Sequence, residues 1–312
     1  MTTEIFENLK SSDVSKWGQE PLHLRHRLHQ TDLFTDDSLA DLIERLPQME
    51  SPVVLMPPKE ARDERWSYCD RSGLTGHEVL DAIRHGRLWI NMLSLQTIDP
   101  RFERLLEAIF DEIGTVIPDF SPFRKSIGLL ISSPNNAVSY HADLPGQSLW
   151  QIRGRKRIYI YPPTQPFLRH EEIENIARGV QEEELSYDPS FDAFAQTYDL
   201  TEGDMLHWPL NGPHRVENAD CLNVSVTTEH WTPTPRRSFA MNYGNGILRR
   251  ELGWKPKSRA LAGPAFWAKV ALTVAWRKAG LQSRTSFKRV MTSRVDPSAP
   301  DGYRPFHPSP AE

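Results

Sequence analysis

Cysteine is scarce in this chain. Its 312 residues include two, Cys69 and Cys221, which lie far apart and form no CxxC pair. This pattern provides no disulfide framework and suits a reducing cytoplasm. Long apolar runs are also missing, because the longest, from Leu261 to Trp276, is interrupted by Lys269 and is too short to span a membrane. The N-terminus has no basic-then-apolar signal pattern, so we expect a soluble, cytoplasmic protein without a membrane span.

Charge of one sign is not in excess either. The 37 Lys and Arg residues and 41 Asp and Glu residues give a net charge of -4, which argues against a general nucleic-acid binder. The sequence contains no P-loop, no dinucleotide-binding glycine fingerprint and no GxSxG elbow. The hydrophobic content of 38% is ordinary for a globular protein, and the length allows one large domain or two small ones.

Helical and strand-like patterns divide the chain into regions. Residues 1–120 mix both patterns, and residues 121–232 contain many short strands separated by turn signals, which favours a sandwich or jelly roll. An acidic insert at 164–199 interrupts this β-rich region. Residues 233–294 are strongly basic and helical, and the proline-rich residues 295–312 are predicted to be a disordered tail.

Capping residues and apolar spacing predict the individual elements. Thr35, Thr75 and Asp99 are expected N-caps, the last followed by proline at the first helical position. The predicted helices are 36–46, 75–85, one that starts at Asp99-Pro100, and 264–280. The predicted strands are 53–56, 88–95, 126–132, 137–143, 148–161, 205–208 and 222–231.

His141-Ala142-Asp143 and His214 carry the strongest chemical signal. Side chains two apart in a strand point to the same face, so His141 and Asp143 can hold one ion together. Two imidazoles and one carboxylate form the facial triad of non-haem Fe(II) oxygenases, which leaves coordination positions open for substrate and dioxygen. HxD alone is a weak motif, but here it lies between strand-like segments, and His214 begins a later strand.

Lys156 is the next candidate. On the expected strand it shares a face with Ile158 and Ile160, which would place a cation in an apolar interior where it needs an anion. A cosubstrate that bears a carboxylate would supply one. If Gly154-Arg155 is a two-residue hairpin turn, Arg153 lies across from Lys156 and shares this role. The alternative is that the RGRK cluster is a solvated turn.

The stretch from His141 to Pro163, with Gly203-Asp204, Pro213-His214 and Asn223–Val226, resembles the JmjC-type cupin oxygenases, in particular the asparaginyl hydroxylase of hypoxia-inducible factor. The resemblance covers residues 120–232. It implies a mainly β fold: a double-stranded β-helix, or jelly-roll, core with flanking helices, followed here by C-terminal helices. It also implies Fe(II), 2-oxoglutarate and dioxygen as cofactor and cosubstrates.

Carried across by position, the resemblance assigns roles to single residues. His141, Asp143 and His214 would bind iron, and Lys156 would pair with the distal carboxylate of 2-oxoglutarate. Gln147 falls where the family often has an asparagine near the cosubstrate. Two positions depart from the pattern. Val138 replaces a hydroxyl that helps to bind 2-oxoglutarate, with Tyr140 or Ser139 as substitutes, and Glu229 replaces a neutral polar residue, where a carboxylate repels 2-oxoglutarate unless it is protonated, paired or turned away.

Several interpretations stay open. The acidic insert is typical of a solvated face, and the alternative is a lid over the site. The basic helices are expected to pack on the barrel or on a second copy of the chain, with their arginines meeting the acidic insert, rather than to bind membrane or nucleic acid. His207 and His230 are expected to be structural. A second metal at His23, His26 and His29 is disfavoured.

Three functions fit these residues. The first is an Fe(II)- and 2-oxoglutarate-dependent oxygenase that hydroxylates a C–H bond of a protein or peptide side chain, or alternatively of a small molecule. The second is a cupin-like metal- or ligand-binding regulatory protein without turnover, which Val138 and Glu229 favour. The third is a metal-dependent cupin of another class, against which Lys156 argues.

Overall fold

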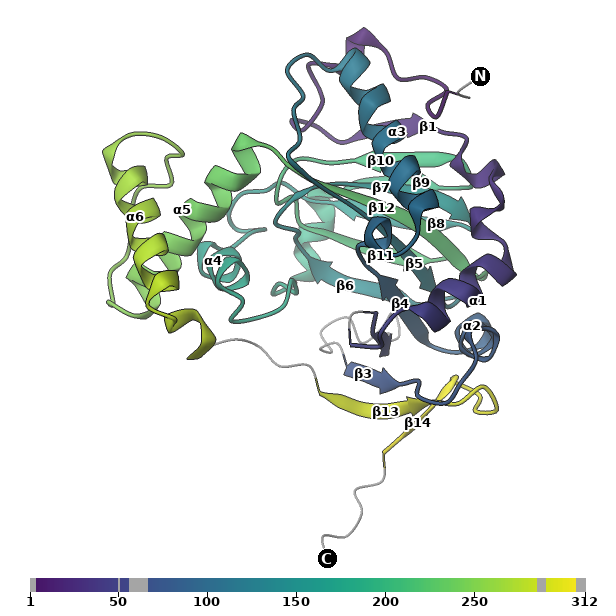
Figure 1. The fold of residues 1–312 in the computed structure, drawn as a ribbon. Coiled ribbons are helices and arrows are strands. Elements are labelled where there is room, and N and C mark those ends of the chain that lie inside the picture. Colours follow the sequence, from purple (N-terminus) through teal and green to yellow (C-terminus); the bar gives the residue numbers. More distant parts are fainter. Residues whose placement is uncertain (1–3, 50, 56–66, 285–289, 307–312) are drawn as a thin grey trace, which may run out of the picture.

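Two facing β-sheets form the centre of the protein (Figure 1). The computed structural model describes residues 4–49, 51–55, 67–284 and 290–306. The larger sheet has the order β1 (Leu22–Arg25), β10 (Asp204–His207), β7 (Gly146–Arg153), β12 (Asn223–Trp231), β5 (Arg124–Ser132), β4 (Leu88–Met92), β2 (Val53–Leu55), β3 (Ser67–Asp70), β13 (Met291–Val295), β14 (Tyr303–Pro305). The smaller sheet has the order β6 (Ala137–His141), β11 (His214–Asn218), β8 (Lys156–Ile160), β9 (Gln196–Leu200).

The strands from β5 to β12 make a jelly roll. Apart from the step from β8 to β9, each strand in this run is followed by one in the opposite sheet, so that β10-β7-β12-β5 faces β6-β11-β8-β9. All pairings within these two groups are antiparallel. The predicted double-stranded β-helix is therefore confirmed. Its eight strands include β9, which the acidic insert contributes.

One predicted strand proves to be two. The segment 148–161 divides at Gly154, where φ is +80°, and the chain crosses from β7 in the larger sheet to β8 in the smaller one. A side chain at Gly154 is excluded on steric grounds too, since a Cβ there would lie 2.3 Å from the carbonyl oxygen of Leu222. The expected hairpin between Arg153 and Lys156 does not form, because the two strands belong to different layers.

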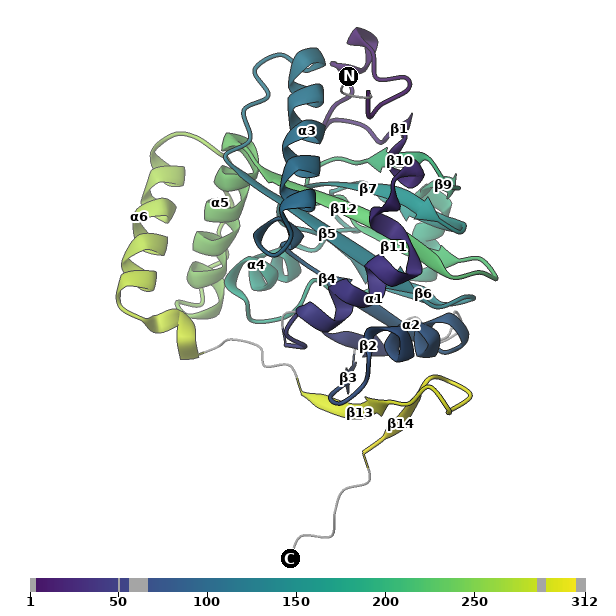
Figure 2. The same ribbon diagram turned by 45° about the vertical axis from the view of Figure 1, so that its right-hand side comes forward.

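Three helices cover the outer face of the larger sheet (Figure 2): α1 (Asp36–Arg45), α2 (Gly76–His85) and α3 (Pro100–Val116). Their predicted caps are present, with Thr35, Thr75 and Asp99 each accepting a hydrogen bond from a backbone N–H of the first turn. Alternate residues of β5 pack against these helices, and the residues between them face the other sheet. The buried core on the helix side includes Leu42, Ile83, Phe102, Ile109, Ile127, Leu129 and Ile131.

The remaining helices gather at one end of the sandwich: α4 (His170–Arg178), α5 (Pro233–Arg250) and α6 (Pro264–Lys278) (Figure 1). The helix predicted at 264–280 is α6. Short 3₁₀ turns complete the described chain at Ser11–Asp13, Leu28–Gln30, Asp32–Phe34, Leu95–Thr97, Pro189–Phe194 and Leu281–Arg284. Within the described ranges, no helix combines the length and apolar character needed to cross a bilayer.

The prediction of disorder for residues 295–312 is wrong for residues 295–306. β13 pairs in parallel with β3, β14 pairs antiparallel with β13, and Val295 is buried in the main core. Proline content suggested a tail, but the distant β3 offers backbone N–H and C=O partners that composition does not reveal. Residues 307–312 lie outside the described part of the chain.

Candidate metal centre and active-site cavity

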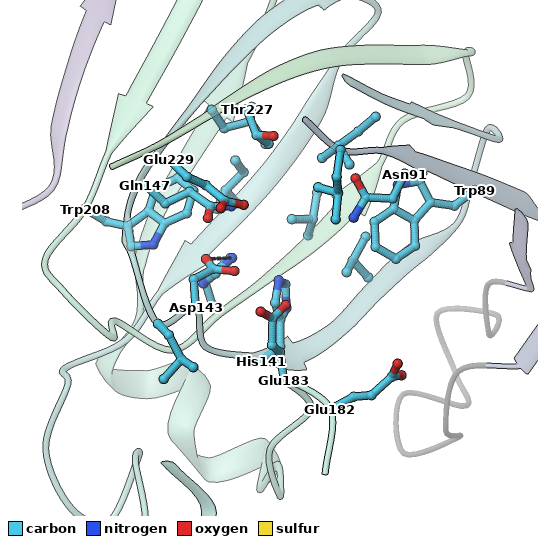
Figure 3. A pocket seen from close by; sticks show the side chains of 18 of the residues that line it. Trp89, Asn91, His141, Asp143, Gln147, Glu182, Glu183, Trp208, Thr227 and Glu229 are labelled. Atoms are coloured by element: carbon cyan, nitrogen blue, oxygen red, sulfur yellow. Dashed lines mark ion pairs between the residues drawn. The ribbon is translucent and has the colours of Figure 1, made fainter. Parts of the chain in front are cut away.

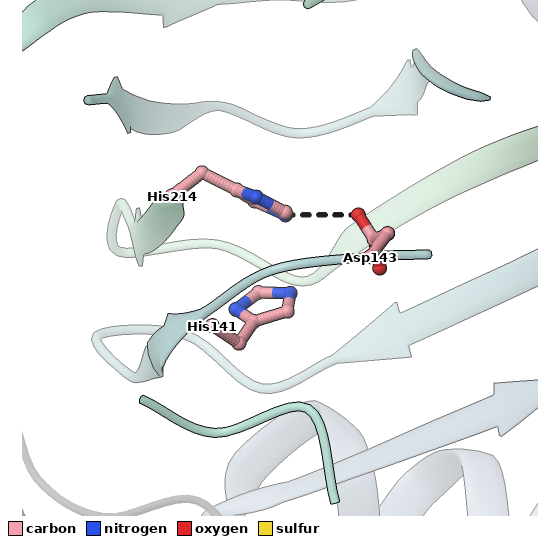
Figure 4. A group of neighbouring side chains, drawn as sticks. All are labelled: His141, Asp143 and His214. Carbon is pink, nitrogen blue, oxygen red and sulfur yellow. Dashed lines mark ion pairs between the residues drawn. The ribbon is translucent and has the colours of Figure 1, made fainter. Parts of the chain in front are cut away.

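His141, Asp143 and His214 converge in the interior of the jelly roll (Figure 4). His141 ends β6 and is the cross-strand neighbour of His214, the first residue of β11. One ligand atom from each of the three side chains lies within 4.8 Å of the others, and all three residues are buried. The register of β6 and β11 thus places the two histidines side by side, and the residues that follow β6 bring Asp143 next to them.

A bulge in β6 sets the direction of these side chains. His214 pairs with His141 and Val216 pairs with Val138, so β6 uses one more residue than β11 over this interval. An extra residue reverses the alternation of side chains along a strand. Val138 and His141 therefore both face the cavity although they are three residues apart.

Backbone carbonyls orient both imidazoles. Nδ1 of His141 lies 2.7 Å from the carbonyl oxygen of Ser139, and Nδ1 of His214 lies 3.0 Å from that of Gly212. Because a carbonyl can only accept, each Nδ1 carries the proton and donates it, which leaves the Nε2 lone pair for a metal. Burial lowers the pKa of His141 to about 4 and that of His214 well below its usual value, so both rings are neutral at pH 7.

The donor set fits a divalent cation. Nε2 of His214 lies 3.5 Å from Oδ2 of Asp143. With His214 neutral and protonated on Nδ1, the Nε2 lone pair faces the carboxyl group of Asp143, and Oδ2 is buried with no hydrogen-bond partner. Burial, with the nearby Glu183 and Glu229 carboxylates, raises the pKa of Asp143 well above its usual value. A cation between these atoms would accept the Nε2 lone pair and compensate the buried carboxylate.

The triad opens into a cavity of about 310 Å³ between the two sheets (Figure 3). Lys156 lines it from β8, where it stands opposite Asn218, while Ile160 at the other end of the strand stands opposite His214. Four residues of β-strand separate these positions, roughly 13 Å along the backbone. The long lysine side chain and the metal ligands can therefore bind opposite ends of one small anion.

Lys156 is a buried cation without a counter-ion among the described residues. Lys156 is 6% exposed, and the alternate residues Arg157 and Tyr159 point away from the cavity, as predicted. Burial lowers the pKa of its ammonium group to about 7, and the Cys221 thiol acts in the opposite direction. Arg153 does not help, because its Nη1 donates to Oδ1 of Asp36 at 2.8 Å on the helix-covered side. Its expected share in anion binding is contradicted.

Gln147 and Glu229 lie beside the metal ligands. They are register partners on β7 and β12, and both line the cavity. Figure 3 shows their side chains close to Asp143. Oε1 of Gln147 is buried without a hydrogen-bond partner, and burial raises the pKa of Glu229. The carboxyl is thus moved toward its protonated form, in which it does not repel an anion.

Tyr140 lies outside the cavity, which contradicts its predicted contact with the cosubstrate. Its hydroxyl donates to the carbonyl oxygen of Phe167 at 2.8 Å, in the apolar cluster beneath the insert. Ser139 also lies away from the cavity, and its hydroxyl is buried without a hydrogen-bond partner. Tyr140 points outward because it adjoins His141, and neighbouring side chains of a strand alternate in direction. The bulge in β6 turns Ser139 outward as well and places Val138 on the cavity side.

Sequence reasoning missed Asn91 and Thr227. Asn91 on β4 and Thr227 on β12 both line the cavity, and Oδ1 of Asn91 is buried without a hydrogen-bond partner. The predicted strand 88–95 already placed Asn91 on the same face as Trp89. Nothing in the sequence indicates that this face lines the site, because β4 lies beside β5 only in the folded sheet.

The acidic insert has two roles rather than one. Gln181, Glu182 and Glu183 line the cavity, whereas Glu174 meets arginines of the C-terminal region. The interpretation as a purely solvated face is therefore wrong, and the expected meeting of the basic region with the insert is confirmed. The insert is not solvated throughout because Glu174 forms ion pairs and the backbone of residues 183–185 forms hydrogen bonds with the chain around His141. Neither contact can be predicted from a run of glutamates.

The other histidines do not form a second centre. Nδ1 of His207 lies 2.8 Å from the carbonyl oxygen of Gln147, and the ring stacks on Trp17 with centroids 4.1 Å apart. His23 pairs with Asp204 at 2.9 Å. In the described ranges, the three residues His141, Asp143 and His214 form the one group with metal-binding geometry.

A family model for the cupin-like domain matches residues 89–235, which span β4 to the start of α5. Residues 89–235 are thus similar in sequence to the cupin-like domain. No curated protein matches the chain in sequence.

Solved structures share the cupin-like fold over most of the chain. The X-ray structure of YcfD from Escherichia coli has a TM-score of 0.51 at 18% identity, over 88% of this chain and 68% of that one. YcfD in complex with cobalt and 2-oxoglutarate, described as a ribosomal oxygenase, has a TM-score of 0.50 at 15% identity over 93% and 75% of the two chains. A further crystal structure of this ribosomal oxygenase also scores 0.50, at 16% identity over 94% and 75%.

Proposed function

We propose that this protein is an Fe(II)- and 2-oxoglutarate-dependent oxygenase that hydroxylates a C–H bond. One observation carries the proposal: a buried two-histidine, one-carboxylate set shares a cavity with a lysine that has no counter-ion among the described residues. His141, Asp143 and His214 would hold the iron. Lys156 would bind the distal carboxylate of 2-oxoglutarate, with Gln147 beside the cosubstrate. The cobalt and 2-oxoglutarate present in the YcfD complex support this assignment.

When bound, iron and 2-oxoglutarate supply the oxidation, in which 2-oxoglutarate and dioxygen yield succinate and carbon dioxide and one oxygen atom enters the substrate C–H bond. The residues of the chain provide orientation and charge. The Ser139 and Gly212 carbonyls hold the two imidazoles with Nε2 toward the iron position. The buried ammonium group of Lys156 favours the binding of an anion over that of a neutral ligand, because the anion compensates the cost of burying its charge.

Succinate formation tests the proposal. Purified protein with Fe(II) and 2-oxoglutarate is expected to release succinate, since oxygenases of this kind show slow turnover without their substrate, and the His141→Ala variant is expected to release none. Equal succinate formation by the wild type and the variant would remove the proposal. Ser139→Ala serves as a matched control, because it alters the neighbouring strand position but leaves the Ser139 carbonyl in place.

A binding protein without turnover is the second candidate. Val138 contributes no hydroxyl to the cavity, and Glu229 contributes a carboxyl group there. Titration of 2-oxoglutarate into the cobalt-loaded protein separates the candidates, because a cupin that does not use 2-oxoglutarate need not bind it. Saturable binding that depends on Lys156 supports the oxygenase. A metal-dependent cupin of another class would have no use for a cation at this position.

A protein or peptide side chain is the substrate that we favour over a small molecule. The name of YcfD as a ribosomal oxygenase supports this choice, and it fits a cytoplasmic location, as do the free cysteines Cys69 and Cys221. Mass spectrometry of cell extract treated with the wild type or with His214→Ala tests it. Oxidised peptides that appear with the wild type alone support a protein substrate, and an oxidised metabolite alone points to a small molecule.

The C-terminal helices offer a surface for a second copy of the chain. Trp267 and Val274, seven residues apart on α6, are 59% and 47% exposed, so one face of this helix presents two large apolar side chains to solvent. Burial of this face against its counterpart would form a homodimer. Sedimentation of the wild type and of Trp267→Glu measures it directly, with a concentration-dependent dimer expected for the wild type and a monomer for the variant.

A further inference from the structure

Three ion pairs join two buried side chains of helix α4, the acid Glu174 and the base Arg178, to the C-terminal region. Glu174 of α4 accepts from Nε of Arg249 on α5 at 2.8 Å and from Nη1 of Arg259 at 3.0 Å. One turn further along α4, Arg178 donates to Glu251, just beyond α5, at 2.6 Å. Helix α4 thus supplies an acid and a base, and α5 with the residue that follows it supplies the complementary base and acid. Reversing or shifting α4 along α5 would place like charges together.

Both α4 side chains are enclosed. Glu174 is 1% exposed, and the side chain of Arg178 is 1% exposed. Gly246 on α5 makes room for the arginine, since a Cβ at that position would lie 2.6 Å from its Cδ. Buried ion pairs seldom add stability over apolar packing, but breaking one is strongly destabilising because it leaves an uncompensated buried charge, which disfavours arrangements that separate the partners. The pairs therefore fix the position of α4 rather than simply attach it.

The position of α4 matters because the chain runs directly from it to the metal site. Ile176 of α4 lines the cavity, and the following residues 181–183 form part of its wall. This segment then pairs with the strand that carries the ligands. The N–H of Ala142 donates to the carbonyl oxygen of Glu183 at 3.1 Å, and the N–H of Leu185 donates to that of Tyr140 at 2.9 Å.

We propose that Glu174, through Arg249 and Arg259, is a positioning residue for the metal site. The ion pairs fix α4, α4 fixes residues 183–185, and those residues hold the backbone on either side of His141 on its open edge. The C-terminal helices thus help to hold His141, at the edge of the smaller sheet, in its position. The proposal rests on the proposed function for its metal-binding readout, and its hydrogen-exchange readout is independent of that function.

The test compares Glu174→Gln with Glu171→Gln. Glu171 lies on the same helix and also pairs with Arg249, but its side chain is 55% exposed, so it is the matched control. In Glu174→Gln we expect amide exchange at Ala142 and Leu185 to be about tenfold faster. We also expect the Kd for Co(II), read from the visible absorption of the bound ion, to rise about tenfold, as for other groups that support metal ligands. The control should match the wild type in both measurements.

The outcomes are distinguishable. A Glu174→Gln protein that loses thermal stability but keeps wild-type exchange at Ala142 and Leu185 and wild-type Co(II) affinity would overturn the proposal, because the pairs would then be merely structural. If that variant does not fold, Arg259→Gln removes one of the two cations and is expected to show smaller changes in the same direction; no change there also overturns it. If the wild-type protein binds no Co(II), the proposed function is wrong. The hydrogen-exchange comparison still tests whether Glu174 positions the backbone on either side of His141.

Discussion

Replacement of Lys156 by methionine should weaken 2-oxoglutarate binding and at the same time stabilise the ligand-free protein. Methionine has a similar shape and no charge, so it fits the same space on β8. The pKa of Lys156 falls from its ordinary 10.5 to about 7 because the ammonium group is buried. At about 1.4 kcal/mol per pKa unit, this corresponds to a penalty of roughly 5 kcal/mol for the charged form in the empty cavity.

The stability gain depends on pH in a defined direction. A lysine whose pKa is depressed on folding destabilises the folded state fully below the folded pKa, and this destabilisation fades as pH rises toward the unfolded pKa. The advantage of Lys156→Met should therefore be about 4–5 kcal/mol at pH 6.5 and about 1–2 kcal/mol at pH 9.5. Urea unfolding of both proteins at the two pH values measures it.

The binding effect has the opposite sign. Loss of one partner from a buried charge pair costs about 3 kcal/mol or more, which predicts at least a hundredfold rise in the KM for 2-oxoglutarate. Arg157→Met is the control, because Arg157 is the next residue on β8 but points outward and pairs with Asp199. The reasoning would be refuted by a Lys156→Met protein that matches the wild type in stability at both pH values, or that keeps its KM.

Three further predictions concern other groups. His141→Ala should abolish Co(II) binding, measured by visible absorption, whereas retained affinity would exclude His141 as a ligand. Glu229→Gln should stabilise the metal-free protein by an amount that grows as pH rises above 4.5, because burial raises the pKa of Glu229 and its ionisation opposes folding; a flat difference in urea midpoint with pH would contradict this. Arg153→Gln should leave the KM for 2-oxoglutarate unchanged and cost at most about 1 kcal/mol of stability, since Arg153 pairs with Asp36 in a partly exposed position, and a raised KM would restore it to the site.

Local chemistry made many elements predictable. The caps at Thr35, Thr75 and Asp99 are satisfied by residues within one helical turn, so their helices could be located without knowledge of the fold. Strand periodicity likewise placed Lys156 on an inward face, which the burial of alternate residues of β8 confirms. The metal triad could be proposed because its three residue types belong to few chemistries.

Long-range pairing set the limit of prediction. Whether Gly154 makes a hairpin or a crossover depends on which sheet accepts β8, and the smaller sheet accepts it through contacts with β11 and β9. The bulge in β6 could not be predicted for the same reason, because it is defined by the pairing of β6 with the distant strand β11. It turned Ser139 away from the cavity and left Val138 facing it.

The sequence by itself determined which side chains have the chemistry for a metal and an anion, since residue type and strand alternation are local properties. Tertiary structure alone decided that Asn91, Thr227 and Glu183 share a cavity with them, and that Glu174 finds two arginines more than seventy residues away. These contacts arise from sheet order and helix packing, which depend on the simultaneous burial of distant segments rather than on any short stretch of chain.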